Sequence, residues 1–80
     1  MEYKKLSGSS REDALKMLRR DMGDITVGTY IPWSKKLLTS MFDSNAEAAS
    51  FVESHGCRIV FNDPRCNENL AAIRRPLPTE

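Results

Sequence analysis

The side chains best suited to hold a metal or to act as a nucleophile are His55, Cys57 and Cys66. Zinc takes four ligands, which usually come as two closely spaced pairs. His55 and Cys57 form one such pair, but Cys66 stands alone, and a carboxylate such as Asp63 would have to be the fourth ligand. The spacing that defines a structural zinc site is missing, so we predict no metal and no cofactor.

A catalytic cysteine would need a base, and His55 is the only histidine of the chain. Cys57 lies just beyond it, across Gly56, and a third group would have to orient the imidazole. A disulfide between Cys57 and Cys66 would close a short loop, but only in an oxidising environment. We therefore predict two reduced thiols and a protein that is not an enzyme.

The overall charge excludes a strongly basic nucleic-acid or membrane binder. Twelve Lys and Arg residues stand against eleven Asp and Glu residues, which leaves a formal net charge of +1. Such a balance creates no field over the whole protein that would attract DNA, RNA or an anionic membrane. The apolar runs are too short to span a bilayer, and residues 1–6 lack the apolar core of a secretory signal. We therefore expect a cytoplasmic protein.

Basic side chains near two aromatic residues are the best candidates for a binding surface. Tyr30 and Trp33 flank a predicted turn that holds Lys35 and Lys36. An exposed aromatic residue beside basic ones is a typical anchor of a protein interface, although Trp33 could instead cover the end of a thin core. The predicted protein-binding residues are Tyr30, Trp33, Lys35, Lys36, Lys16, Arg19 and Arg20.

Two segments have the pattern of capped amphipathic helices, residues 9–22 and residues 44–55. Each begins with a serine that is followed three positions later by a glutamate, the spacing of a capping box. Each ends at a glycine, which readily adopts the left-handed conformation of a C-cap. The predicted N-cap and C-cap residues are Ser9 and Gly23 for the first helix, and Ser44 and Gly56 for the second.

The remaining segments are shorter and are separated by turn-forming residues. Alternating β-branched residues predict a strand over residues 25–31, and a second strand is predicted over residues 57–62. We also predict an edge strand over residues 2–6 and a short helix over residues 67–75. Residues 1–75 then form a single domain, and the prolines of residues 76–80 mark a C-terminal tail.

The segment 34–42 decides the fold. As a strand it would form a hairpin with residues 25–31, and its Thr and Ser residues favour this interpretation. The order is then βαββαβ, a ferredoxin-like arrangement with a small antiparallel sheet and two helices on one face. As a helix it would have Ser34 as N-cap, and the order would be that of a winged helix-turn-helix domain. The apolar face of that alternative helix is Leu37, Leu38, Met41 and Phe42.

These observations favour a small, non-catalytic regulatory or inhibitory protein that binds another protein. An inhibitor of larger host machinery, carried by a phage or a mobile element, would fit the size. Dimerisation would stabilise so small a core, but composition does not decide it. The alternative function is nucleic-acid binding with Trp33 or Tyr30 stacking on bases. Its predicted contacts are Lys16, Arg19, Arg20, Lys35, Lys36, Arg74 and Arg75.

The charge of residues 44–55 weakens the nucleic-acid alternative. In a winged helix-turn-helix domain, residues 44–55 would be the recognition helix. This segment carries Glu47 and Glu53 and has no Lys or Arg, so it would approach phosphates with the wrong sign of charge.

Overall fold

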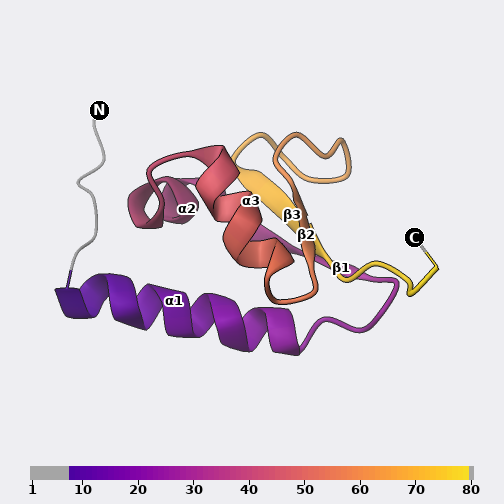
Figure 1. The fold of residues 1–80 in the computed structure, drawn as a ribbon. Helices are drawn as coiled ribbons and strands as arrows, with labels where there is room; N and C mark the ends of the chain where they lie inside the picture. The colour runs from indigo at the N-terminus through magenta and orange to yellow at the C-terminus, as the bar shows by residue number, and fades with distance from the viewer. Residues whose placement is uncertain (1–7, 80) are drawn as a thin grey trace.

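The computed structural model describes residues 8–79, in which three helices pack against a three-stranded antiparallel sheet. The predicted strand over residues 2–6 lies outside the described residues. The helices are α1 (Gly8–Gly23), α2 (Lys35–Met41) and α3 (Asn45–Glu53). The strands are β1 (Tyr30–Ser34), β2 (Arg58–Val60) and β3 (Leu70–Arg74). Figure 1 shows α1 running along one side of the molecule, with α2 and α3 above it.

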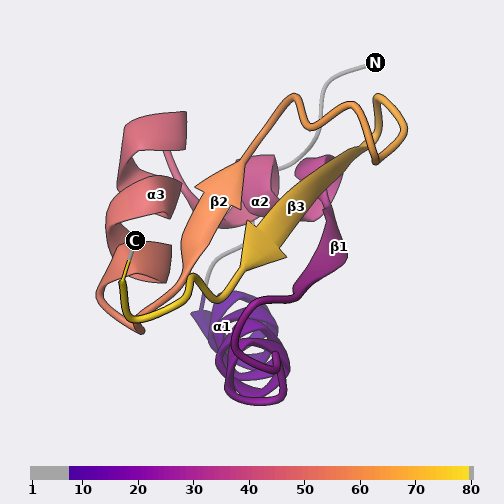
Figure 2. The same ribbon diagram turned by 90° about the vertical axis from the view of Figure 1, so that its right-hand side faces the viewer.

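The sheet has the strand order β1-β3-β2, so its last strand in the sequence is its central one. Both neighbours run antiparallel to β3, with Ile31 and Ile59 each paired with Ile73. In Figure 2 the sheet lies in front of α2, with α3 beside β2 and α1 seen almost end-on below. No helix among the described residues is long and apolar enough to cross a membrane.

The predicted strand over residues 34–42 is wrong, because residues 35–41 form α2. The Ser34 hydroxyl caps this helix by accepting a hydrogen bond from the Leu37 amide at 3.2 Å. The hydroxyl residues that favoured a strand are accommodated within the helix. Thr39 and Ser40 donate to the backbone carbonyls of residues 35 and 36, at 2.9 and 3.0 Å.

The predicted short helix over residues 67–75 is also wrong, because residues 70–74 form the central strand β3. Ala71, Ala72 and Ile73 are each 0% exposed, so this part of β3 is covered on both faces of the sheet. The small α+β fold is therefore confirmed, but the ferredoxin-like order is not. Residues 35–41 are helical, as in the alternative interpretation, but that order has no counterpart of β3, and the observed order is helix, strand, helix, helix, strand and strand.

The capping predictions were confirmed for one helix and not for the other. The Ser44 hydroxyl caps α3 by accepting from the Glu47 amide at 3.1 Å, and Gly56 has a left-handed φ of 76° after the helix. In α1, Ser9 already lies inside the helix, and Gly23 does not have a positive φ. The strand predicted over residues 25–31 begins only at Tyr30.

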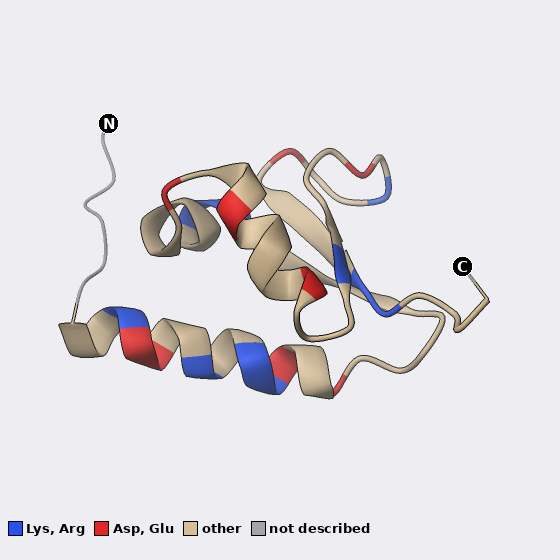
Figure 3. Ribbon diagram, in the orientation of Figure 1, with Lys and Arg blue, Asp and Glu red and all other residues tan. Residues whose placement is uncertain are grey.

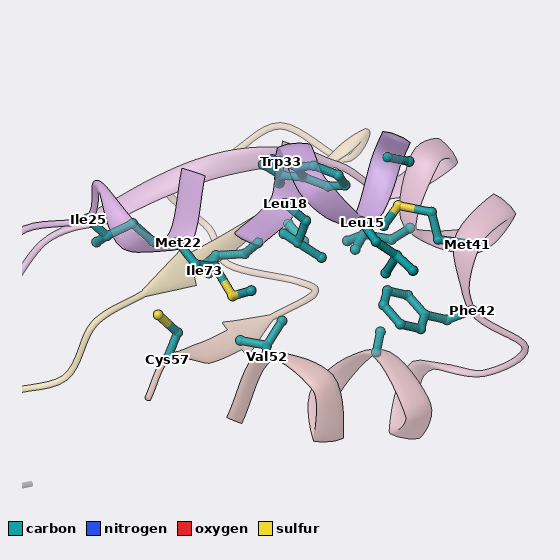
Figure 4. Close-up of a cluster of buried hydrophobic side chains, with 14 residues drawn as sticks. Leu15, Leu18, Met22, Ile25, Trp33, Met41, Phe42, Val52, Cys57 and Ile73 are labelled. Carbon is teal, nitrogen blue, oxygen red and sulfur yellow. The ribbon is translucent and has the colours of Figure 1, made fainter. Parts of the chain in front are cut away.

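The core lies between the helices and the inner face of the sheet (Figure 4). Leu18 of α1, Val52 of α3 and Ile73 of β3 are each 0% exposed. Side chains of two helices and of the sheet therefore meet in one cluster. Each such side chain contributes about 1.5–3 kcal/mol by leaving water. Trp33 and Met41 extend this cluster between α1 and α2.

Candidate functional site

The outer face of the sheet carries a row of side chains that the fold brings together from three separate segments. Because neighbouring residues of a strand point to opposite faces, the isoleucines at 31, 59 and 73 direct Tyr30, Arg58 and Arg74 away from the core. The register places Tyr30 and Arg58 on either side of Arg74. We call Tyr30, Arg74 and Arg58 the arginine row.

Two of these residues form a like-charge pair. Arg58 and Arg74 lie directly opposite each other on antiparallel strands, an arrangement that destabilises a sheet. Arg58 is exposed and Arg74 is half-buried. Arg58 therefore presents its positive charge at the surface of this face.

The loop between β2 and β3, residues 61–69, adds a third arginine to this face. It turns back above the strands in Figure 1. The Arg65 guanidinium lies 4.1 Å from the centre of the Tyr30 ring, a cation–π contact. Its Nε and Nη2 donate to the two carboxylate oxygens of Asp63, at 3.0 and 2.6 Å. The loop is thus fixed over one end of the arginine row.

Asp63 is the buried acid of this cluster, with 8% of its surface exposed. The side-chain and backbone hydrogen bonds from Arg65 lower the pKa of Asp63 from 3.8 to about 2, and the charge of Arg74 adds to this effect. The carboxylate is therefore ionised at neutral pH. It is paired with Arg65 and also interacts with the charge of Arg74.

Trp33 does not have the exposure predicted for an interface anchor. It is 6% exposed and packs in the core beside α1. Its indole Nε1 donates to Asp21 Oδ2 at 2.9 Å. The prediction of an exposed aromatic anchor is wrong for this residue, and the alternative in which Trp33 covers the core is confirmed.

The two lysines after β1 lie on a different part of the surface. Lys36 is exposed, and Lys35 Nζ donates to Asn62 Oδ1 at 3.3 Å. A hollow of about 230 Å³ lies between α2, the start of α3 and the β2–β3 loop. Its lining residues are Lys35, Thr39, Asn45, Phe61 and Asn62.

The basic residues predicted to contact nucleic acid do not form one surface. Lys16, Arg19 and Arg20 lie on the exposed side of α1. Arg75 is used within the protein, where Nε donates to the Ile25 carbonyl at 2.9 Å and Nη2 to the Met22 carbonyl at 2.7 Å. Figure 3 shows basic and acidic positions interspersed along α1 and over the rest of the molecule.

The structure does not bring the thiol of Cys57 to the imidazole of His55. His55 Nδ1 lies 2.8 Å from the Phe51 carbonyl, and the Cys57 thiol donates to the His55 backbone carbonyl at 3.8 Å. Burial raises the pKa of Cys57 more than the charge of Arg75 lowers it. Cys57 and Cys66 are both free thiols. Within residues 8–79, no three His, Cys, Asp or Glu side chains gather closely enough to hold a metal ion.

The arginine row borders an acidic surface on one side. The exposed face of α3 carries Glu47 and Glu53, and the helix contains no Lys or Arg. Glu53 and Arg58 share a second hollow of about 240 Å³, at the start of β2. The other residues of this hollow are Gly56, Cys57 and Pro76.

Sequence reasoning missed Arg58 and Arg65 as candidate site residues. Strand alternation could have placed Arg58 on the outer face of the sheet. Ile59 faces the core, so its neighbour in the strand must face outward. The predicted helix over residues 67–75 hid the pairing of Arg58 with Arg74, because Arg74 belongs to the strand β3. Comparisons with protein-family models, with curated proteins and with solved structures gave no match for this chain.

Proposed function

We propose that this chain is a small regulatory or inhibitory protein that binds another protein through the outer face of its sheet. The observation that carries the proposal is the arginine row, in which Arg58 and Arg74 face each other at a cost to the sheet. Arginine is enriched at protein interfaces, and Arg58 is exposed on this face. The exposed side chain of Val60 on the same face adds apolar contact area.

The surroundings of the row support a protein ligand more than a nucleic acid. A phosphate backbone that continued past Arg58 would meet Glu53 and then the rest of the acidic face of α3. A protein surface can place one anionic group on the row and neutral or basic groups beside the glutamates.

Nucleic-acid binding is the second candidate function, and the element order favours it. The helices α2 and α3 are joined by residues 42–44 and are followed by two strands and a loop, which supports a winged helix-turn-helix arrangement. Lys35 and Lys36 lie in the first turn of α2, where the first helix of such a pair approaches the backbone. The acidic face of α3 argues against it.

Site-specific photocrosslinking in the source cell tests the proposed function. A benzoylphenylalanine residue replaces either Val60, on the outer face of β2, or Met17, on α1. These two sites are matched, since the side chains are 38% and 37% exposed in turn. We expect a nuclease-resistant protein adduct from position 60, with a lower yield when Arg58→Gln is added, and none from position 17.

Three other outcomes would contradict this proposal. A nuclease-sensitive adduct from position 60 would assign the face to nucleic acid. An adduct from position 17 alone would move the interface to the basic side of α1. An adduct that contains only two copies of this chain would replace the separate partner by self-association.

A further inference from the structure

We infer that the outer edge of β2 binds an extended segment of the partner protein, which joins the sheet as a fourth strand antiparallel to β2. The inference rests on the proposed function and specifies the shape and chemistry of the partner. It follows from the backbone groups of the sheet, from two hollows beside β2 and from the charges around them.

The pairing of β1 with β3 shows which backbone groups point toward each strand. In an antiparallel pair, residues bonded to the partner strand alternate with residues whose N–H and C=O groups point away. The Lys35 amide donates to the Asn69 carbonyl at 3.1 Å, and the Arg75 amide donates to the Thr29 carbonyl at 3.1 Å. Pro32, which has no N–H, therefore lies at a position of β1 that points away from β3.

The same alternation places the backbone groups of Ile59 on the outer edge of β2. Ile73 directs its backbone groups toward β1, so its two neighbours in β3 direct theirs toward Arg58 and Val60. Ile59, which lies between these two, directs its N–H and C=O away from β3. Within residues 8–79, no other element forms a hydrogen bond with these two groups. Because buried backbone groups without a partner are rare, this edge faces water.

The opposite edge of the sheet is closed to a further strand. Pro32 offers no N–H in the middle of the outer edge of β1, and Ser34 ends this strand as the N-cap of α2. The strand β2 contains no proline. An added strand can therefore pair with β2 but not with β1.

Two hollows lie at the two ends of β2 and can receive side chains of the added strand. Cys57 lines the hollow at the start of β2, and Phe61 lines the hollow at its end. Both side chains pack toward the core, as Ile59 does. Residues 57 and 61 are about 13 Å apart along an extended chain. A paired segment would therefore place two side chains, four positions apart, at the two hollows.

The lining of each hollow specifies the side chain that fits. Lys35 and the amides of Asn45 and Asn62 line the hollow at the end of β2, which favours an acidic side chain. Cys57 and Pro76 give the hollow at the start of β2 an apolar lining, between the opposite charges of its other borders. In antiparallel pairing, the segment therefore has an acidic residue four positions before an apolar one.

A second copy of this chain is a poorer occupant of the edge than a partner segment. The helix α3 lies beside β2 in Figure 2, so pairing two β2 edges would bring two α3 helices close together. Each carries Glu47 and Glu53 and has no Lys or Arg. The two acidic helices would repel each other, whereas one acidic side chain at Lys35 is attracted.

The test is an NMR titration of the ¹⁵N-labelled full chain with the peptide Ser-Glu-Thr-Val-Thr-Val-Ser, blocked at both ends. With its central valine opposite Ile59, the peptide places its glutamate at one hollow and its last valine at the other. We expect the Ile59 amide proton to move downfield in a saturable manner and to exchange more slowly with solvent. A peptide with Lys in place of Glu should bind about threefold more weakly.

N-methylated peptides test the main-chain pairing directly. Methylation of the central valine removes an N–H that faces β2 and should weaken binding about tenfold. Methylation of the threonine after it removes an N–H that points away, so this matched control should change the affinity less than about twofold. Ile59→Pro removes the outward donor of β2 as Pro32 does in β1, and should also weaken binding about tenfold.

Several results would overturn the inference. Equal loss with either N-methylated peptide would show that binding does not use main-chain pairing with β2. Tighter binding of the Lys peptide would contradict the acidic side chain. A wild-type dimer in sedimentation, separated by Ile59→Pro, would assign the edge to a second copy. If the unmodified peptide leaves the Ile59 amide unchanged while the position-60 crosslink to a protein persists, strand addition is wrong and the proposed function stands.

Discussion

The indole of Trp33 donates a hydrogen bond to the carboxylate of Asp21 at 2.9 Å, which links β1 to the last turns of α1. The donor is 6% exposed and belongs to the core. This contact holds Trp33 in the core, so Trp33 is not an exposed anchor for a protein interface. It also joins the long helix to the sheet at a point where the intervening chain, residues 24–29, has no regular structure.

Loss of this contact should destabilise the fold. We predict that Asp21→Ala lowers the free energy of unfolding by about 1.5–3 kcal/mol, because a buried indole N–H loses a charged acceptor. Urea unfolding followed by fluorescence measures this change, since Trp33 is the only tryptophan. Asp24→Ala, at an exposed position just after the helix, is the control and should change stability by less than about 0.5 kcal/mol.

The Asp63–Arg65 pair should make stability depend on acid pH. The folded-state pKa of Asp63 is about 2, below its ordinary value of 3.8, so the ionised carboxylate is favoured by folding. Its contribution is therefore complete above pH 4 or so and is lost as the pH falls toward 2. We expect the difference in unfolding free energy between the wild type and Asp63→Asn to shrink over this range. A difference that stays constant from pH 5 to pH 2 would show that the pair is not formed.

Replacing the serine cap of α2 should destabilise the helix that sequence patterns assigned to a strand. We predict that Ser34→Ala lowers the free energy of unfolding by about 1 kcal/mol, and that Ser44→Ala at the start of α3 has an effect of similar size. Ser50→Ala, on the exposed face of α3, tests the effect of removing a hydroxyl that is not a cap. If Ser34→Ala behaves like this control, the α2 cap is not a stabilising contact.

Removing one arginine of the like-charge pair should not lower the free energy of unfolding, in contrast to the substitutions above. We predict that Arg58→Ala leaves stability unchanged or raises it by about 0.5 kcal/mol, since the repulsion across the strands disappears. The same substitution should reduce partner crosslinking from position 60. Thermal unfolding measures the first effect, and a drop of more than about 1 kcal/mol would mean that Arg58 has a structural role instead.

The two cysteines should react at different rates with a thiol reagent. Cys57 is 2% exposed and burial raises its pKa, whereas Cys66 is half-buried in the β2–β3 loop. We predict that iodoacetamide labels Cys66 first at pH 8, which peptide mass spectrometry of timed samples will show. Unfolding in urea should equalise the two rates, and equal rates in the native protein would contradict the burial of Cys57.

The sequence patterns correctly predicted structural features that depend on local interactions. The helix over residues 9–22 and the cap at Ser44 were predicted because amphipathic spacing and capping act within one or two turns. The hydroxyls of Thr39 and Ser40 misled the assignment of α2, since their bonds to backbone carbonyls are visible only in the folded helix.

Long-range pairing accounts for the features that were not predicted. The segment around Ala71 and Ala72 has helix-forming residues, and its strand conformation is imposed by neighbours on both sides. The arginine row depends on this pairing, because Arg58 and Arg74 meet only through the register of β2 with β3. Periodicity within one segment cannot reveal such a meeting.

The position of β3 between the other strands has a consequence for how the molecule assembles. Neither β1 nor β2 has a hydrogen-bonded neighbour in the sheet until residues 70–74 insert between them. During synthesis, the helices can form early, but both outer strands must wait for almost the whole described chain to leave the ribosome. The closing step joins segments about forty residues apart in the case of β1, which slows it relative to a local hairpin. Any truncation that removes these five residues should leave a collapsed helical chain in place of a shortened version of the native protein.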